Sequence, residues 1–242
     1  MKSQIVIITP TPAVIDMVIQ NSILRQAVER QVVVFHVVNL RDFGLSNYHQ
    51  IDDAPFGGGS GMVLMAEPLF QAIEQGINLI GDAGEYEVLY PSPAGELWSH
   101  GEALAISEKK QLIVICGHYK GIDERVREKY VTREYSLGDF VVSSGELPAM
   151  LMIDSIVRLI PGVLNTYESA MTDSFATDLL DGPHYTRPRE IDGRPVPEVL
   201  LSGHHRQIEA WRLKQREEIT RRRRPDLWDK YVNKRDSGDL SK

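Results

Sequence analysis

The chain has 242 residues, of which 42% are hydrophobic and 25% charged, and its single cysteine is Cys116. This composition suits one or two folded domains with a sizeable core. It excludes an internal disulfide and a zinc site built from several cysteines, and we expect a cytoplasmic protein. No apolar run reaches the ~18 residues that a membrane span needs, so we expect no membrane partner.

Charge is distributed unevenly along the chain, whose formal net charge is −7. Residues 201–242 contain 12 Lys and Arg against 7 Asp and Glu, a balance of +5, so the first 200 residues carry −12. Such asymmetry indicates that the C-terminal segment binds a polyanion. The alternative is an ordinary solvated, charged helix.

The first two thirds of the chain predict alternating strands and helices. Apolar β-branched runs predict strands at residues 4–9, 31–39, 86–90, 112–116 and 137–142. Apolar residues at helical spacing predict helices at residues 12–28, 67–75, 97–108, 122–128 and 148–160. The opening β-α-β order favours parallel pairing, which predicts an α/β domain. The last of these helices is apolar enough that we expect it to be buried.

The composition changes after Pro161, where small polar residues, proline and glycine accumulate. We therefore predict a first domain at residues 1–163, a linker at 164–175 and a small helical domain at 176–242. Ser202 is a candidate N-cap for the main helix of this second domain, and Pro225 interrupts that helix.

Two predicted strands end in glycine-bearing loops, one with Gly117 and Gly121, the other with Gly138 and Gly145. Ligands of open α/β sheets bind beyond the carboxyl ends of the strands, and glycine lets bare backbone approach a ligand. We interpret these loops as a small-molecule pocket lined mainly by main chain. The alternative is a pair of ordinary glycine turns in a parallel sheet.

Motifs in both halves of the chain occur in a recognisable order, namely IDDAPFGGGSGM, YPSPAG, CGHYKGIDERV, YSLGDFVVSSGELPAM, IDSIVRLIPGVL, TDSF, LLDGPHYTRP, VPEVLLSGHH and WRLKQ. Over about residues 5–225 the chain closely resembles the bacterial tRNA (guanine-N1)-methyltransferases that modify the base 3′ of the anticodon, G37. That family belongs to the trefoil-knotted (SPOUT) methyltransferases. The resemblance implies a deep trefoil-knot, parallel-sheet α/β domain followed by a small α-helical C-terminal domain.

The resemblance also implies a cofactor, S-adenosylmethionine (SAM), and a homodimer whose active sites lie at the interface of two chains. The family's cofactor loops map here to the residues Tyr90, Ser92, Pro93, Gly95, Gly117, Tyr119, Gly121, Leu137, Gly138, Phe140, Val142, Ser144, Gly145 and Pro148.

Two side chains match the family's catalytic positions. Asp173 in TDSF matches the proposed general base, which removes the proton of guanine N1. Arg158 matches the cation that stabilises the negative charge on O6. The alternatives are a cap by Asp173 on a helix that begins at Ser174, and a pair between Arg158 and Asp154 on one helix face.

Contacts with tRNA are expected in both parts of the chain. The candidates are Asp52, Gly59, Gly61, His184, Tyr185, Arg187, Ser202, His204 and His205. For the C-terminal members of this set the alternative is a role as ordinary loop and cap residues.

The chain departs from the family at GHYKG, where family members have G-R-Y-E-G. Family members are thought to need magnesium, and that glutamate is one suggested anchor. Lys120 reverses the charge, which argues against a magnesium ion anchored there and predicts no metal ligands. Two other hypotheses stay open: a knotted SAM-dependent methyltransferase acting on a different RNA base, and an RNA-binding dimer of the same fold with little catalysis.

Overall fold

A computed structural model describes residues 2–81, 85–164 and 173–237 of the chain. The chain divides into two compact units, Met1–Tyr167 and Glu168–Lys242. The division falls inside the predicted linker, and residues 165–172 of that linker lie outside the described residues. In the described part of the chain, no helix has both the length and the apolar character that a membrane crossing needs.

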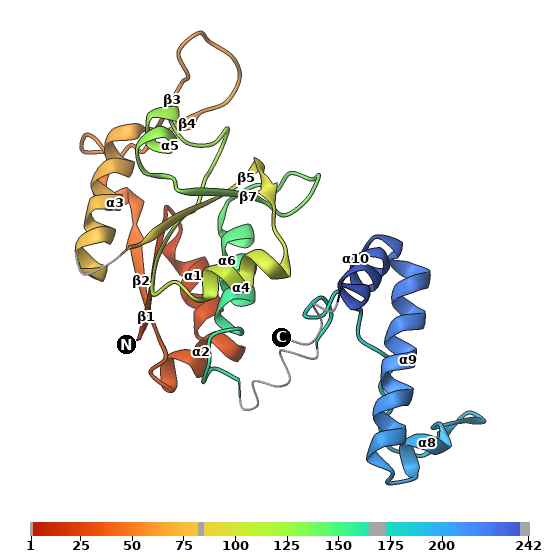
Figure 1. The fold of residues 1–242 in the computed structure, drawn as a ribbon. Coiled ribbons are helices and arrows are strands. Elements are labelled where there is room, and N and C mark those ends of the chain that lie inside the picture. The colour runs from red at the N-terminus through yellow and green to blue at the C-terminus, as the bar shows by residue number, and fades with distance from the viewer. Residues whose placement is uncertain (1, 82–84, 165–172, 238–242) are drawn as a thin grey trace. The chain divides into compact units, whose positions relative to one another are not determined.

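Unit 1 is built on a five-stranded sheet with the strand order β2-β1-β6-β5-β7. Every neighbouring pair in it is parallel, which confirms the predicted α/β class. The strands are β1 (Ser3–Thr9), β2 (Val33–Asn39), β5 (Glu87–Leu97), β6 (Gln111–Ile115) and β7 (Arg133–Ser136). A separate antiparallel pair, β3 (Asp52–Asp53) and β4 (Val63–Leu64), forms the base of the glycine-rich loop (Figure 1).

Helices cover both faces of the sheet, as Figure 1 shows. They are α1 (Pro12–Ile19), α2 (Ser22–Glu29), α3 (Ala66–Ile80), α4 (His100–Ser107), α5 (Glu124–Tyr130) and α6 (Glu146–Val157), with a 3-10 turn at Leu40–Phe43. Local chemistry sets several of their ends. The Ser99 hydroxyl accepts a hydrogen bond from Glu102 N and caps α4, and the Asp123 carboxylate accepts from Arg125 N and caps α5.

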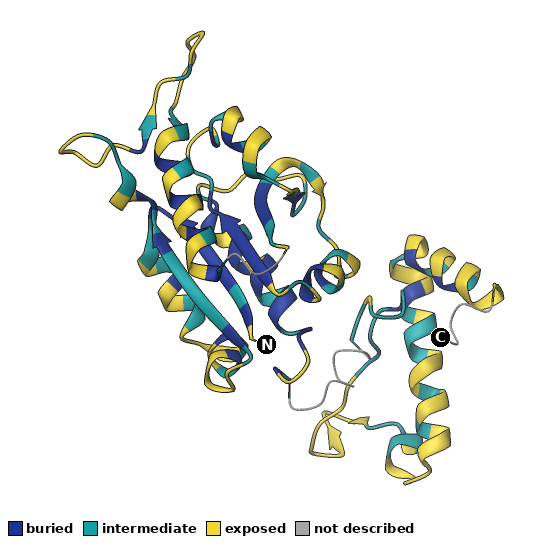
Figure 2. Cartoon of the chain, turned by 60° about the vertical axis from the view of Figure 1, so that its left-hand side comes forward, coloured by how far each residue is buried: buried dark blue, intermediate teal, exposed yellow. Residues whose placement is uncertain are grey.

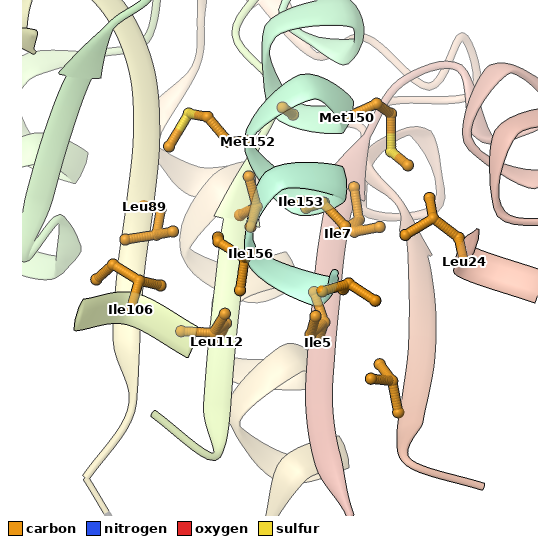
Figure 3. Packing of buried hydrophobic residues seen from close by; sticks show 14 of the residues in the cluster. Ile5, Ile7, Leu24, Leu89, Ile106, Leu112, Met150, Met152, Ile153 and Ile156 are labelled. Carbon is orange, nitrogen blue, oxygen red and sulfur yellow. The ribbon is translucent and has the colours of Figure 1, made fainter. Parts of the chain in front are cut away.

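The side chains of β1 point alternately to the two faces of the sheet and pack into two separate layers of the core. Ile5 and Ile7 pack with α1, α2, α4 and α6 on one face of the sheet, as Figure 3 shows around Ile153 and Ile156. On the other face Val6 and Ile8 pack with residues of α3 and α5. Successive strand residues point to opposite faces, so a strand buried on both sides is apolar along its buried middle, as residues 5–8 of β1 and 112–115 of β6 are (Figure 2).

Three predicted elements of unit 1 are wrong in detail. The helix predicted over residues 12–28 is two helices, because Ser22 takes a left-handed backbone conformation (φ 51°) after α1. The strand predicted at residues 137–142 is a loop, and the edge strand is β7 instead. The strand predicted to end at residue 90 continues to Leu97 as β5, and its register against β7 shifts between Pro91 and Glu96.

Most of helix α6 is buried, as its composition predicted, but one side of it is exposed. Its inner side packs in the core around Ile153 and Ile156, whereas Leu147 and Leu151 on its outer side are 56% and 62% exposed. Two leucines at i and i+4 lie on the same side of a helix. The apolar outer face is therefore a surface feature that composition alone concealed.

Unit 2 contains three helices and one short hairpin in its described residues. These are α8 (Glu198–Leu201), α9 (His205–Arg223) and α10 (Pro225–Asp236), with β8 (Glu190–Ile191) antiparallel to β9 (Arg194–Pro195). Thr220 on α9 is buried and accepts a hydrogen bond from Leu180 N, whereas most of α9 is exposed (Figure 2). Ser202 is the C-cap of α8, so the predicted N-cap is wrong; His204 holds that position for α9.

The register shift of β5 against β7 depends on Gly95. A Cβ atom at this position would lie 2.4 Å from the backbone of Glu134 and Tyr135 in β7. We expect Gly95→Ala to lower the free energy of unfolding by about 1–3 kcal/mol, the range for overpacking. Gly101→Ala in α4 is the matched control, because its Cβ meets a single atom, Ser99 Oγ, at 3.7 Å. Urea unfolding of both variants checks this, and equal stability of Gly95→Ala and wild type would contradict it.

Candidate functional site

A cavity of about 480 Å³ opens beside the carboxyl ends of β6 and β7. Its walls come from residues 90–93 of β5, residues 117–121 after β6, the loop that follows β7, and the first turns of α6. The volume is in the range of sites that enclose a small organic ligand. The position agrees with the general rule for open parallel sheets, which bind ligands at the carboxyl ends of strands.

The cavity brings together all but one of the residues predicted to hold a cofactor. The lining members of that set are Tyr90, Ser92, Pro93, Gly117, Tyr119, Gly121, Leu137, Gly138, Phe140, Val142, Ser144, Gly145 and Pro148. Gly95 is the exception, and it serves the contact between β5 and β7 instead. The loop that was predicted as a strand, residues 137–142, thus forms a wall of the cavity.

Two glycine loops meet here backbone to backbone. Gly145 N donates a hydrogen bond of 2.7 Å to Gly117 O, and an isolated β-bridge joins His118 to Ser144. A Cβ on Gly145 would lie 2.4 Å from Gly117 N, and one on Gly117 would lie 2.9 Å from the Tyr90 ring. Neither position has room for a side chain, so the main chain itself forms this part of the wall.

A buried carboxylate lies behind this wall. Glu146, the first residue of α6, is 1% exposed. It accepts hydrogen bonds from Thr9 Oγ1 (2.5 Å) and Thr11 Oγ1 (2.7 Å), and His118 Nε2 lies 2.9 and 2.8 Å from its two oxygens. Burial alone would raise the pKa of Glu146, but the bonds from His118, Thr9 and Thr11 outweigh it and lower this pKa to about 2. The carboxylate therefore stays ionised inside the fold.

Thr11 connects the start of α1 to the hydrogen bonds around Glu146. It is the N-cap residue of α1, and the helix begins at Pro12, as predicted. Its hydroxyl makes no capping bond, however, and goes to Glu146 instead.

The two predicted catalytic residues do not line the cavity. Arg158 is the C-cap of α6 in unit 1, and its charge lowers the pKa of Asp154 against the larger effect of burial, which raises it. Asp173 lies in unit 2, where its carbonyl accepts a hydrogen bond from Ala176 N. Residues 173–178 form turns and a bend, so the helix that Asp173 was alternatively expected to cap is absent from this described stretch.

The predicted substrate residues of unit 1 belong to the glycine-rich hairpin. Asp52 pairs with Leu64 at its base, and Gly59 and Gly61 take positive φ values of 117° and 97° in the loop. A Cβ on Gly61 would approach the side chain of Lys120 to 3.1 Å. The loop thus packs next to Lys120, which also lines the cavity.

Unit 2 contains a cavity of its own, of about 500 Å³. Three predicted substrate residues, His184, Tyr185 and Arg187, line it together with Arg189 and Arg212. Among the described residues its lining contains no Asp or Glu, and apolar surface comes from Val196, Leu200, Leu201 and Ile208. Ser202, His204 and His205 do not line it; they form the turn from α8 to α9, where Ser202 Oγ accepts from His204 N.

Comparison with known proteins decides the family. The family model described as tRNA (Guanine-1)-methyltransferase TrmD matches residues 1–230. Relatives named tRNA (guanine-N(1)-)-methyltransferase include those of Chlorobium luteolum, 48% identical over 91% of this chain and 94% of its own length, and Brevibacillus brevis, 49% identical over 93% and 91%. That of Clostridioides difficile is 45% identical over 94% of this chain and 98% of its own length.

The chain belongs to the tRNA (guanine-1)-methyltransferase family. The resemblance inferred from the motifs is thereby confirmed, and the chain is an enzyme of this methyltransferase family.

Several lining residues of this family member were not predicted. Tyr135 and Ser136 were missed because β7 was predicted too far along the chain, and Leu147 and Leu151 because α6 was expected to be buried. Pro91 was missed because the predicted strand ended at residue 90. Glu146 could have been noticed as the acid of SSGELP, directly after the second glycine loop. The link from Glu146 to Thr9, 137 residues earlier, leaves no local signal in the sequence.

Among the described residues, no group of three or more His, Cys, Asp and Glu side chains is arranged to hold a metal ion. The charged and imidazole side chains that line the unit 1 cavity are Lys120 and His118. Carboxylates and carbonyls, rather than ammonium groups, bind magnesium. These residues do not fit a magnesium site.

Because of Glu146, we expect the free energy of unfolding of this methyltransferase to decrease at acid pH. A carboxyl whose pKa is lower in the folded state stabilises the fold above its unfolded pKa, about 4.3, and loses that contribution as pH falls toward the folded value. We therefore expect the stability difference between wild type and Glu146→Gln to be largest above about pH 5 and to shrink toward about pH 2.

Urea unfolding across this pH range measures that difference. Glu29→Gln is the control, because Glu29 forms a solvent-exposed pair with Arg25. A stability difference for Glu146→Gln that stays constant from pH 7 to pH 3 would contradict the buried-carboxylate interpretation.

Proposed function

We propose that this chain uses SAM to methylate N1 of guanosine 37 in tRNA. The observation that carries the proposal is the cavity beside the strand ends, walled by main chain, in a member of the tRNA (guanine-1)-methyltransferase family. On this proposal the chain acts on tRNA in the cytoplasm.

The unit 1 cavity fits SAM in its size and in the chemistry of its lining. At Gly117, Gly121, Gly138 and Gly145 the cavity wall is main chain, and peptide groups can recognise the edge of an adenine without using charge. Leu137, Phe140, Val142 and Pro148 offer apolar surface to a ring and a ribose. When bound, SAM supplies an electrophilic methyl group.

Guanine N1 carries a proton at neutral pH and is a poor nucleophile until that proton leaves. On our proposal the Asp173 carboxylate accepts this proton as the bond between N1 and the methyl carbon forms, and the methyl–sulfur bond breaks with its electron pair staying on sulfur. The Arg158 guanidinium stabilises the negative charge that develops on O6.

The surface of unit 1 next to the cavity supports the proposal of a homodimer with its active sites at the interface. Phe140, Val141, Leu147 and Leu151 all line the cavity, and each is between 56% and 86% exposed. Large apolar side chains grouped at one place on a surface mark an interaction site. A second copy of the chain that covers them would also close the mouth of the cavity.

The cavity of unit 2 supports the proposal that this unit binds RNA. In the described part of the chain Arg187, Arg189 and Arg212 form no ion pair with a carboxylate, whereas Arg224 pairs with Asp226 and Lys234 with Asp178. Guanidinium groups that face a cavity without an acidic partner are suited to phosphate. Phosphate contacts of this kind position a substrate without specifying its sequence.

The deep trefoil knot stays part of the proposal. It is supported by the contacts that hold the segment after β7 against the segment after β6, chiefly the bond from Gly145 N to Gly117 O.

Methyl transfer from labelled SAM to two tRNA transcripts, one with G37 and one with A37, tests the proposed reaction. We expect transfer to the G37 transcript and none to the A37 transcript. Equal transfer to both would favour a knotted methyltransferase that acts on a different base. SAM binding without transfer to either would favour an RNA-binding dimer with little catalysis.

In the same assay we expect Asp173→Asn to lower kcat by about 10²–10⁴-fold with SAM affinity unchanged, because an amide cannot accept the proton. Arg158→Ala should lower kcat by roughly 10²-fold, the scale of losing one donor to a developing oxyanion. Asp178→Asn and Arg25→Ala are matched controls, since both residues form ion pairs elsewhere in the chain. Near-normal turnover of Asp173→Asn would refute its assignment as the base.

We expect Leu151→Lys to convert the wild-type dimer into a monomer, because it places a charge within the exposed apolar surface. Light scattering after size-exclusion chromatography measures the mass. Leu79→Lys is the control, since Leu79 is 39% exposed on α3, which packs on the opposite face of the sheet. A dimer that persists with Leu151→Lys would show that this surface is not the interface.

A further inference from the structure

Three segments of unit 1 that are distant in sequence meet at the side chain of Glu146. Thr9 is the last residue of β1, Thr11 precedes α1, His118 follows β6, and Glu146 begins α6. Three side chains, two from residues 9–11 and one from the loop after β6, therefore contact one carboxylate. Together they join the end of β1 to both glycine loops.

The carboxylate of Glu146 determines that His118 is the hydrogen-bond donor in this pair. An ionised carboxylate only accepts hydrogen bonds, so His118 Nε2, at 2.8 and 2.9 Å from its oxygens, must carry a proton and donate it. Of the side chains bonded to Glu146, His118 is the one that can bear a positive charge. The neighbouring buried thiol of Cys116 stays neutral, since burial and then the Glu146 charge raise its pKa.

The two residues of this pair also belong to the two walls of the cavity. His118 lines the cavity from the loop after β6, and Glu146 lies between the lining residues Gly145 and Leu147. Close by, the backbone bond from Gly145 to Gly117 and the bridge between Ser144 and His118 join the same two loops. The side-chain pair therefore reinforces the joint on which the shape of the cavity depends.

We propose that His118 is a positioning residue for the cofactor: by donating to buried Glu146 it fastens the loop after β6 to the start of α6 and holds the cavity in the shape that binds SAM. The proposal rests on the proposed function of this cavity as the SAM site. His118 acts through Glu146 and the loop backbone, not through the reacting atoms.

Calorimetric titration with SAM tests this in a double-mutant cycle of wild type, His118→Ala, Glu146→Gln and the double variant. We expect each single variant to bind SAM at least about tenfold more weakly, and the double variant to bind no more weakly than the weaker single variant, because each change removes the same interaction. His118→Gln, whose amide can still donate to Glu146, should recover most of the affinity. Turnover at saturating SAM should stay within about threefold of wild type in every variant.

His36→Ala is the matched control, because His36 also bonds a neighbouring side chain, Gln4 Oε1 at 2.8 Å, but lies in β2 away from the cavity lining. It should bind SAM as wild type does. Circular dichroism checks folding. If His118→Ala does not fold, His118→Gln and Glu146→Gln still test whether the hydrogen bond between residues 118 and 146 affects SAM affinity.

Two results would overturn the proposal, and they can be distinguished. Wild-type affinity in His118→Ala, or single-variant losses that simply add in the double variant, would overturn the role of His118 alone. A wild-type chain that does not bind SAM would overturn the proposed function, and this proposal with it.

Discussion

The cavity of unit 1 depends on the contact between the backbones of Gly145 and Gly117. At 2.7 Å from donor to acceptor, with no room for a Cβ on Gly145, this contact brings two loops together as closely as neighbouring strands. Side chains at these positions would push the loops apart and fill the space between them. The wall is therefore made of peptide groups, whose donors and acceptors are fixed in direction and carry no net charge.

A wall of this kind needs support from behind, and the buried carboxylate of Glu146 provides it. An ionised group with 1% exposure is tolerated only when several donors replace its lost water. That requirement makes the network specific, because Thr9, Thr11 and His118 must all reach one side chain. The cost of burying the charge thus favours a single arrangement of β1, the loop after β6 and the start of α6.

Local sequence patterns predicted the parts of the fold that depend on local interactions. The buried strands β1 and β6, Thr11 with Pro12 at the start of α1, and the glycine-bearing ends of the cavity loops could be identified in this way. The prediction of residues 137–142 as a strand failed because apolar residues there face a cavity and a surface, and apolarity alone does not distinguish these from a core. The link between Thr9 and Glu146 could not be predicted, because its partners are brought together only by the complete sheet. The placement of Asp173 and Arg158 in one active site stays a prediction.

The two cavities differ in a way that matches the uneven charge of the chain. The cavity of unit 1 is lined by glycine backbone and apolar side chains with Lys120 as its one Lys or Arg, whereas that of unit 2 has three arginines and no carboxylate. The first suits a compact ligand recognised by its edges and the second a polyanion, and neither lining suits the other ligand. On the proposed function the first cavity holds SAM and the second the phosphates of tRNA, so the uneven charge of the chain separates the two kinds of ligand.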